Sequence, residues 1–442
     1  MRMLTSGEGS RVGPAAAPQA DNSYSGPVTP APGAPAELMV ARTRLLPPSE
    51  NQHELHTLLP TPDAVCSWVR EGEGLVAWGE VARVHTVGAS RFADAAAWWE
   101  DFCRHTEVHD DVGLAGSGLV AFTSLAFADN PGSSVLIVPR VIIGRRDGVT
   151  WMTEIGAGPA DEPQPVTAPR RLRYSADPRP VTRWRAAVKG AVQRIRQGEL
   201  DKVVLARDLV AESDEPIDPR FVLSRLAHRY PECWTFAVDG FVGATPELLV
   251  RRDGAEVSSR VLAGTTWPRE GSTNAELAAE LLSSAKDVGE HGYAVTSLVD
   301  SLRALCSPVQ KQDVEVMQLR NVAHLSTTVT GQLRETSTSL LALAAALHPT
   351  AAVGGTPTAA AMKLIAELED IDRGRYAGPV GWVNAAGDGE LGLALRSAEI
   401  KGKQARLFAG GGIVAESDPD DEVAETDAKF AAVRDALEGV DG

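Results

Sequence analysis

The chain has 442 residues, of which 43% are hydrophobic and 23% are charged, and its formal net charge is −16. This length and composition are typical of a globular protein with one large domain or two ordinary ones. The acidic balance argues against nucleic acid or an anionic membrane as the main partner, so an anionic ligand would need local arginine, lysine or metal.

The cysteines and the N-terminal residues further restrict the class of protein and the compartment expected for it. Four cysteines are widely spaced and none forms a CxxC pair, which argues against a zinc site and a disulfide framework. The N-terminal residues include no apolar signal segment, and no long uncharged apolar run follows. We therefore expect a cytoplasmic protein.

The first part of the chain changes character at about residue 38. Residues 1–38 are rich in proline, alanine and glycine and are predicted to be a disordered tail. Residues 39–181 contain alternating apolar runs that predict strands, with a helix over residues 92–104. They are expected to form the N-terminal, β-rich part of one fold, and residues 158–180 are a proline-rich connection.

The second part, residues 182–442, is expected to carry the function. It begins with a predicted helix over residues 182–197, and strands are predicted at residues 202–210, 234–238, 256–263, 314–319 and 326–333. The last predicted strands flank a Gly387-Asp388-Gly389 turn, which favours a hairpin. Strands with helices inserted between them predict an α+β fold, with large, mostly antiparallel β-sheets covered by helices.

Two acidic pairs have the same spacing. Asp287 and Glu290 lie in a segment with a helical apolar pattern, residues 275–305, and Glu422 and Glu425 lie in AETDAK and the residues before it. Residues three apart share one helix face, so two such helices could hold Mg²⁺, which prefers oxygen ligands. The alternative for either pair alone is a solvated helix face.

Three glycines precede the second acidic pair. A short apolar strand over residues 406–409 runs into Gly410, Gly411 and Gly412, and Lys429 follows four residues after Glu425. Glycines allow close approach of a ligand and offer unobstructed N–H donors, so an anion-binding loop is predicted here.

Several motifs together resemble the chorismate-utilising enzymes, and most closely the isochorismate synthases. The resemblance covers residues 182–433, where the motifs occur in the family's order. They are LDKVVLAR (200–207), GATPELL (243–249), LAGTTWPR (262–269), SAKDVGEH (284–291), HLSTTVTG (324–331), HPTAAVGGTP (348–357), DRGRYAGPVGW (372–382), LALRSAEI (393–400) and AGGGIV with AETDAK.

The resemblance implies Mg²⁺-dependent conversion of chorismate to isochorismate, for menaquinone or siderophore biosynthesis. Lys202 matches the general base that activates water for attack at C2, and Glu247 matches the general acid that protonates the leaving 4-hydroxyl. Taken alone, the residues favour a solvated strand-edge lysine and an ordinary surface glutamate.

The resemblance also assigns the remaining site residues. Glu290 and Glu425 match the direct metal ligands, and Asp287 and Glu422 match carboxylates that reach the ion directly or through water. The positions that match substrate-binding residues are Gly264, Thr265, His324, Tyr376, Arg396, Gly410, Gly412 and Lys429. His291 and His348 are interpreted as structural or supporting residues.

The reaction subtype follows from Lys202. The ammonia-using members of the family generally lack a lysine there, so water is the expected nucleophile and no glutaminase subunit is expected. Salicylate synthase, which goes on to eliminate pyruvate, shares these residues and is the alternative; a catalytically silent chorismate-binding subunit is another. The family implies a monomer that acts on a small molecule.

Overall fold

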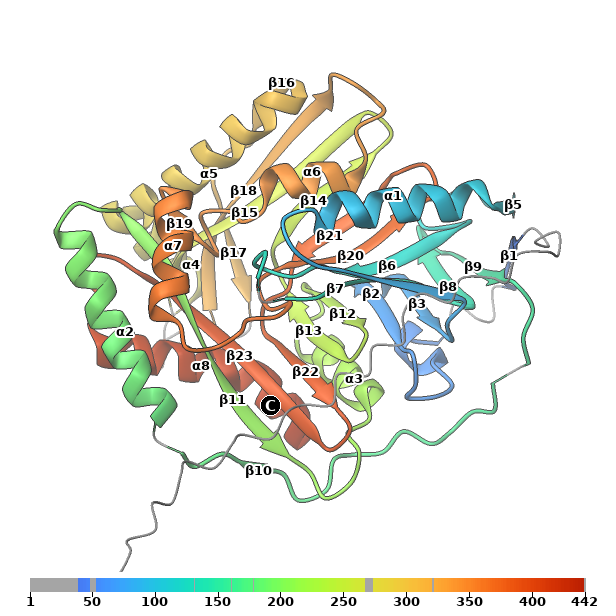
Figure 1. Cartoon of the computed structure of the whole chain (residues 1–442), viewed down its shortest axis with the longest axis horizontal. Coiled ribbons are helices and arrows are strands. Elements are labelled where there is room, and N and C mark those ends of the chain that lie inside the picture. The colour runs from blue at the N-terminus through green and yellow to red at the C-terminus, as the bar shows by residue number, and fades with distance from the viewer. Residues whose placement is uncertain are drawn as a thin grey trace, which may run out of the picture. The chain divides into compact units, whose positions relative to one another are not determined.

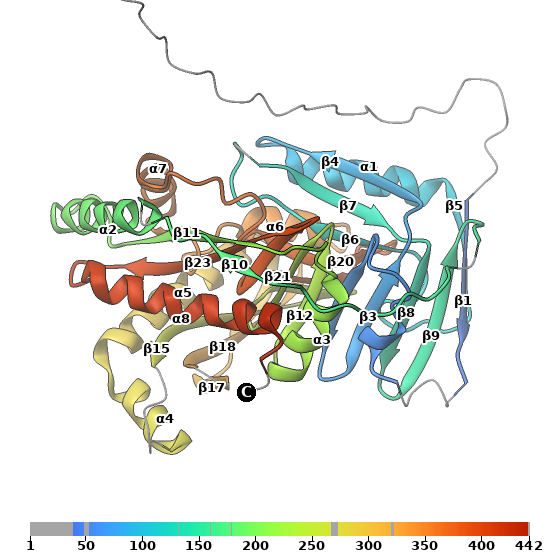
Figure 2. The same cartoon turned by 90° about the horizontal axis from the view of Figure 1, so that it is seen from below.

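The structure is a computed structural model, and two large β-sheets make up most of its described part (Figures 1 and 2). The structure describes residues 39–47, 53–130, 132–159, 161–177, 179–266, 273–319 and 322–440. They fall within one unit, Leu38–Gly442. The disordered tail expected over residues 1–38 lies outside the described residues.

Among the described residues, the first sheet has 13 strands, and its pairing is antiparallel except between β1 and β5. The order along the sheet is β10-β11-β23-β22-β13-β12-β2-β3-β8-β9-β1-β5, and β19 pairs with β11. The bounds are β1 (Met39–Leu45), β2 (Cys66–Arg70), β3 (Glu73–Trp78), β5 (Thr106–Asp110), β8 (Val141–Arg146), β9 (Val149–Ile155), β10 (Arg173–Tyr174), β11 (Lys202–Glu212), β12 (Trp234–Val238), β13 (Phe241–Thr245), β19 (Gly355–Thr356), β22 (Ser397–Lys401) and β23 (Gln404–Ile413).

In the part of the chain that the structure describes, the second sheet has ten antiparallel strands in the order β16-β18-β15-β14-β21-β20-β6-β7-β4, with β17 paired to β18. The bounds are β4 (Ala82–Thr86), β6 (Val120–Ser124), β7 (Ser134–Val138), β14 (Leu248–Asp253), β15 (Glu256–Thr266), β16 (Cys306–Lys311), β17 (Glu315–Leu319), β18 (Val322–Leu333), β20 (Pro379–Asn384) and β21 (Gly389–Leu393).

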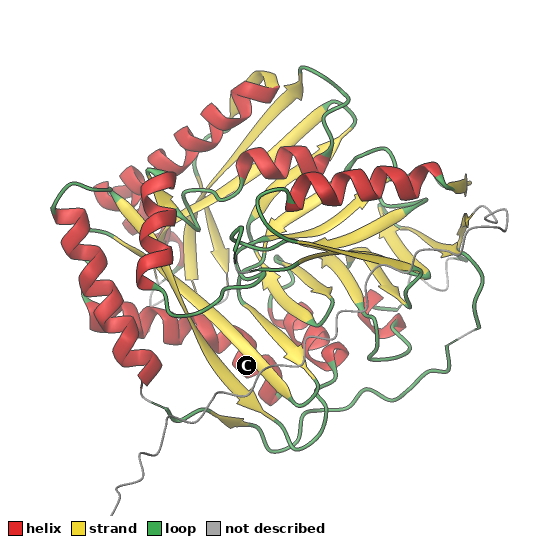
Figure 3. Cartoon of the chain, viewed as in Figure 1, coloured by secondary structure: helices red, strands yellow, loops and turns green. Residues whose placement is uncertain are grey.

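Helices cover these sheets, as Figure 3 shows. Their bounds are α1 (Arg91–Arg104), α2 (Arg179–Arg196), α3 (Pro219–Arg229), α4 (Asn274–Ser283), α5 (Ala285–Leu305), α6 (Leu340–Leu347), α7 (Thr358–Leu368) and α8 (Pro419–Glu438), with a 3₁₀ helix, η2 (Leu55–Leu58). Helix α5 packs on β15 and β18, whereas α8 packs on β23. The predicted α+β class is therefore confirmed.

The chain crosses from one sheet to the other at two places that matter for the site. Only Pro246 and Glu247 separate β13 of the first sheet from β14 of the second. The return crossing, between β21 and β22, ends at Arg396, whose φ of 45° is unusual for a residue with a side chain. Residues on these crossings lie where the two sheets meet.

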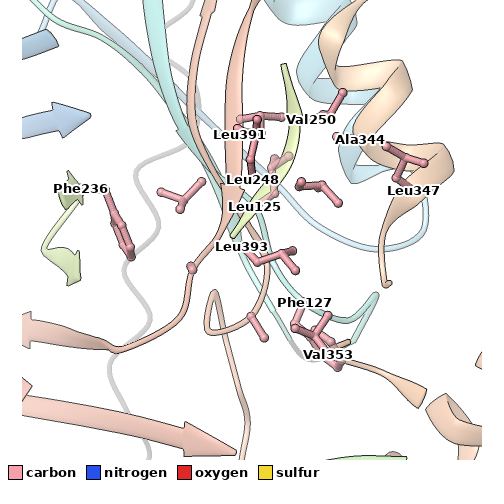
Figure 4. Packing of buried hydrophobic residues seen from close by; sticks show 14 of the residues in the cluster. Leu125, Phe127, Phe236, Leu248, Val250, Ala344, Leu347, Val353, Leu391 and Leu393 are labelled. Atoms are coloured by element: carbon pink, nitrogen blue, oxygen red, sulfur yellow. The ribbon is translucent and has the colours of Figure 1, made fainter. Parts of the chain in front are cut away.

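Apolar packing holds this junction together (Figure 4). Leu248 and Val250 of β14 and Leu391 and Leu393 of β21 are buried in one cluster with residues of α6. Burying a leucine side chain stabilises a fold by about 1.5–3 kcal/mol. The crossing at Glu247 is thus fixed by the core directly after it.

Most predicted strands are confirmed, and the segment over 275–305 is largely helical as predicted. This helical segment is divided into α4 and α5, because Ser284 is extended and its side chain caps α5 by accepting from the Asp287 N–H. Two details of the sequence interpretation are wrong. The glycines 410–412 continue strand β23, paired with β11, and do not form a loop. The last predicted strand is divided into β21 and β22 by the sheet crossing.

None of the helices in the described residues is long and apolar enough to span a membrane.

Candidate active site

A cavity of about 220 Å³ lies where the two sheets meet. Every residue to which the sequence assigned a catalytic, metal-binding or substrate-binding role lines it. These are Lys202, Glu247, Gly264, Thr265, Asp287, Glu290, His324, Tyr376, Arg396, Gly410, Gly412, Glu422, Glu425 and Lys429. We call this space the reaction cavity.

Lys202 is the first residue of β11 and reaches the cavity beside β23. Its Nζ forms a close ion pair with Oε1 of Glu290 on α5, and the two side chains are 15% and 25% exposed. A Cβ at Gly412 would lie 2.8 Å from Lys202 Cε. The absence of a side chain at Gly412 therefore makes room for the lysine.

Glu247 is buried on the crossing between the sheets. Its N–H donates to Thr245 Oγ1 (3.3 Å), its carbonyl accepts from the Leu393 N–H (3.1 Å), and the Pro246 carbonyl accepts from Arg260 Nη2 (2.7 Å). Burial raises the pKa of Glu247 to about 8, although Lys202 and Arg260 act in the opposite direction. Glu247 is thus a carboxylic acid at neutral pH and can donate a proton.

The raised pKa of Glu247 predicts a pH-dependent stability. In the unfolded chain this carboxyl ionises near its ordinary value of 4.5, whereas in the folded protein it keeps its proton to about pH 8. Its contribution to the free energy of unfolding is therefore complete below the lower pKa and is lost as the pH rises through the higher one.

Glu247→Gln, which cannot ionise, should consequently unfold at a higher temperature than the unsubstituted protein at about pH 9, with a much smaller gap at about pH 5. Thermal unfolding at the two pH values measures this difference. The matched control is Glu256→Gln, at an exposed position of β15. If the difference in unfolding temperature between Glu247→Gln and the unsubstituted protein were the same at both pH values, a buried, protonated Glu247 would be contradicted.

Four carboxylates approach the cavity from two helices. Asp287 and Glu290 come from α5, and Glu422 and Glu425 come from α8. Asp287 accepts from Ser284 Oγ and from the Thr265 N–H (3.4 Å), and Glu422 accepts from Ser417 Oγ (2.8 Å).

Two of these carboxylates form ion pairs with different lysines, Glu290 with Lys202 and Glu425 with Lys429. Within the described ranges, no three His, Cys, Asp or Glu side chains are grouped as metal ligands. An ideal Cβ at Gly411 would lie 2.7 Å from Glu422 Oε2 and 3.9 Å from Glu425 Oε1, so both carboxylates face one bare stretch of strand. Carboxylate oxygens beside open backbone fit a hard divalent cation.

Arg396 and His324 also line the reaction cavity and contact each other. Arg396 Nη2 donates to His324 Nε2 (3.4 Å), while His324 Nδ1 contacts Thr265 Oγ1 (3.1 Å) and the Gly264 carbonyl (3.3 Å). Burial, together with Arg396 and Lys429, lowers the pKa of His324 to about 3, so the ring is neutral. Arg396 Nη1 is buried and has no hydrogen-bond partner in the described structure. Such a group suits a planar carboxylate.

Tyr376 and Lys429 add further hydrogen-bond donors to the cavity. Tyr376 stacks on Phe408 with ring centroids 5.3 Å apart, and burial raises the pKa of its hydroxyl, which stays a donor. Lys429 Nζ donates to the Gly410 carbonyl (2.8 Å) and to Glu425 Oε1 (2.6 Å). A Cβ at Gly410 would lie 3.2 Å from the Tyr376 hydroxyl, so the glycine leaves that hydroxyl accessible.

Sequence reasoning missed Arg373, which also lines the cavity. It is buried, pairs with Glu369, and donates to the carbonyls of Val353 (3.1 Å) and Val204 (2.7 Å). Glu369 precedes the motif DRGRYAG and Arg373 lies within it. Their i,i+4 spacing and opposite charges were the sequence feature that could have indicated this ion pair. Arg373 therefore ties β11 to the loop before β19.

His291 and His348 do not line the reaction cavity. His291 Nε2 contacts Thr327 Oγ1 (2.7 Å), and His348 Nε2 contacts the Phe127 carbonyl (2.9 Å). Both rings thus have contacts within the protein core.

A family model described as "Chorismate binding enzyme" matches residues 66–438. Isochorismate synthase DhbC of Bacillus subtilis is 41% identical over 272 residues, covering 58% of this chain and 68% of that protein. The salicylate biosynthesis isochorismate synthase of Pseudomonas aeruginosa is 32% identical over 409 residues, covering 85% of each chain. The structure of MenF, the menaquinone-specific isochorismate synthase of Escherichia coli, matches with a TM-score of 0.75 and 25% identity, covering 90% of this chain and 94% of that one.

Proposed function

Because the chain belongs to the family of chorismate-binding enzymes, we propose that it is an isochorismate synthase, an isomerase that converts chorismate to isochorismate. The observation that carries the proposal is the gathering of an acid, a base, anion-binding groups and paired carboxylates around one cavity. The product would serve menaquinone or siderophore biosynthesis in the cytoplasm.

The chemistry needs one base and one acid on opposite sides of a ring. The Lys202 amine removes a proton from water as the water oxygen bonds to C2 of chorismate. The ring double bonds shift, the C4–O bond breaks, and Glu247 gives its proton to the departing oxygen. One water is consumed and one is released, so the step is an isomerisation without an oxidant or a second substrate.

Substrate carboxylates are held by the cationic and hydroxyl groups of the cavity. Arg396 offers a buried guanidinium nitrogen that has no partner among the described residues, and Tyr376 offers a hydroxyl in the same cavity. Lys429 and the backbone N–H groups at Gly410 and Gly412 are the further donors in our assignment. A planar guanidinium pairs with a carboxylate through two parallel hydrogen bonds, which fixes the ring's orientation.

The carboxylates Asp287, Glu290, Glu422 and Glu425 are the residues that would hold Mg²⁺. A bound Mg²⁺ supplies positive charge that orients and neutralises a substrate carboxylate. Glu290 lies against Lys202 in the structure, so the same carboxylate also positions the amine. Water as the nucleophile requires no glutaminase subunit, and a monomer suffices because all of these residues come from one chain.

Product identification tests the proposal. Purified protein with chorismate and Mg²⁺ is expected to yield isochorismate as the main product by liquid chromatography, and isochorismate supplied alone should return chorismate. Chorismate with Mg²⁺ but without protein is the control. Salicylate and pyruvate as the main products would assign the chain to the salicylate synthases, and no consumption of chorismate would indicate a silent binding subunit.

A further inference from the structure

A second cavity, of about 180 Å³, lies behind the reaction cavity. The two share Glu247 and Ala352. Its far side is formed by α5 and α6, where Ser297 and Ala346 are exposed, whereas Glu247 is only 6% exposed. We call it the rear cavity; it runs from an exposed mouth between two helices to the buried acid.

The rear cavity has a polar lining that the reaction described above does not use. Its wall includes Ser259, Ser301, Thr350, Thr358 and His348. Hydroxyl groups of this kind both donate and accept, so they can hold water in more than one orientation.

Three residues on this wall each have a buried polar atom without a partner in the described structure: Thr350 (Oγ1), His348 (Nδ1) and Arg260 (Nε). His348 is 9% exposed, and its Nε2–H donates to the Phe127 carbonyl (2.9 Å), which leaves Nδ1 as an acceptor. Buried polar atoms without protein partners are normally satisfied by water, and a water molecule occupies about 30 Å³ in the liquid. A cavity of this size and lining therefore suits a short chain of water molecules.

The opposite reacting group has a space of its own. A cavity of about 300 Å³ borders Lys202 and Glu290 and opens beside Tyr293, which is 70% exposed. The base and the acid thus each border a further space besides the reaction cavity, and these two spaces have Ala294 of α5 and Ala351 in common.

The proposed reaction requires a path for a water molecule and a proton on the side of Glu247. When Glu247 protonates the departing oxygen, a water molecule forms beside a buried carboxylate while the ring still occupies the reaction cavity. Glu247 has then lost a proton that Lys202 has gained, and it must be reprotonated before the next turnover. A route for water on the acid's side meets both requirements without release of the ring.

We propose that the rear cavity is a water channel through which the water formed at C4 leaves and through which Glu247 regains its proton. The proposal rests on the proposed function, because it assigns the cavity to the second water of that reaction.

Blocking the mouth tests the channel. In the double variant Ala346→Phe with Ser297→Phe, a large side chain enters the mouth from each helix. The matched control is Ala345→Phe with Thr296→Phe, at exposed neighbours on the same two helices that do not line the rear cavity. Steady-state kinetics, the solvent deuterium isotope effect and thermal unfolding are measured for the unsubstituted protein and both double variants.

We expect the blocked variant to lose kcat several-fold with an unchanged KM for chorismate, an unchanged melting temperature and a larger solvent isotope effect on kcat. The control should match the unsubstituted protein. Full kcat in the blocked variant, an equal loss in the control, or a loss confined to KM would overturn the channel. If the unsubstituted protein makes no isochorismate, the proposed function is wrong. If the unsubstituted protein makes isochorismate and the blocked variant has the same kcat, the proposed function stands and only the water channel is refuted.

Discussion

Lys202→Ala or Glu247→Gln should nearly abolish isochorismate formation while the protein remains folded and still binds chorismate. A positioned acid or base typically contributes about 10²–10⁴-fold to a rate, so we expect a loss of kcat in that range for each variant. Because the two residues act on opposite sides of one ring in one step, the double variant should be little worse than the worse single variant. Both single variants should also fail with isochorismate as the substrate, since the roles reverse.

The measurement is kcat in both directions, with chorismate binding followed separately by calorimetry. Lys189→Ala, at an exposed position of α2, is the matched control for loss of a lysine. A Lys202→Ala protein that forms isochorismate at the unsubstituted rate would refute the assignment of the base, and the same result for Glu247→Gln would refute that of the acid.

Substitution of a carboxylate in the reaction cavity should also lower the activity strongly. Glu290→Gln or Glu425→Gln keeps the shape of the side chain but removes a negative charge that a divalent cation needs, so we expect activity to fall by orders of magnitude and the Mg²⁺ dependence to shift to higher concentration. Titration of Mg²⁺ by calorimetry, in the presence of chorismate, gives a readout that does not depend on turnover.

Asp421→Asn is the control, because Asp421 is exposed on the same helix as Glu425 and does not line the cavity. An excess of chelator should silence the unsubstituted protein and leave its melting curve largely unchanged. Full activity with chelator, or unchanged Mg²⁺ affinity in both glutamine variants, would exclude these carboxylates as the metal ligands.

Local patterns predicted a large share of the fold. Alternating apolar residues located strands such as β12 at residues 234–238, and the Gly387-Asp388-Gly389 turn correctly predicted the β20–β21 hairpin. The i,i+3 spacing of each acidic pair correctly placed both members on one cavity wall. These features depend on residues close in sequence, which is why periodicity captures them.

The site itself depended on contacts between distant segments. From its neighbours alone, Glu247 has the pattern of a surface glutamate, and its burial arises only because two sheets meet around it. The glycines 410–412 resembled a loop because their strand character comes from pairing with β11, some 200 residues away in sequence. The ion pair of Glu290 with Lys202 likewise follows from packing, whereas Glu425 and Lys429 are four residues apart on α8 and pair within that helix.

The two crossings between the sheets have a mechanical consequence. Glu247 lies on one covalent connection and Arg396 lies at the end of the other, so any rocking of one sheet against the other would displace the proposed acid and the proposed carboxylate-binding arginine together. A rigid ring bound between them would contact residues of both crossings at once and would therefore brace the two sheets against each other. The free energy of ligand binding would then add to the resistance of the whole unit to unfolding and would not be confined to the loops around the cavity.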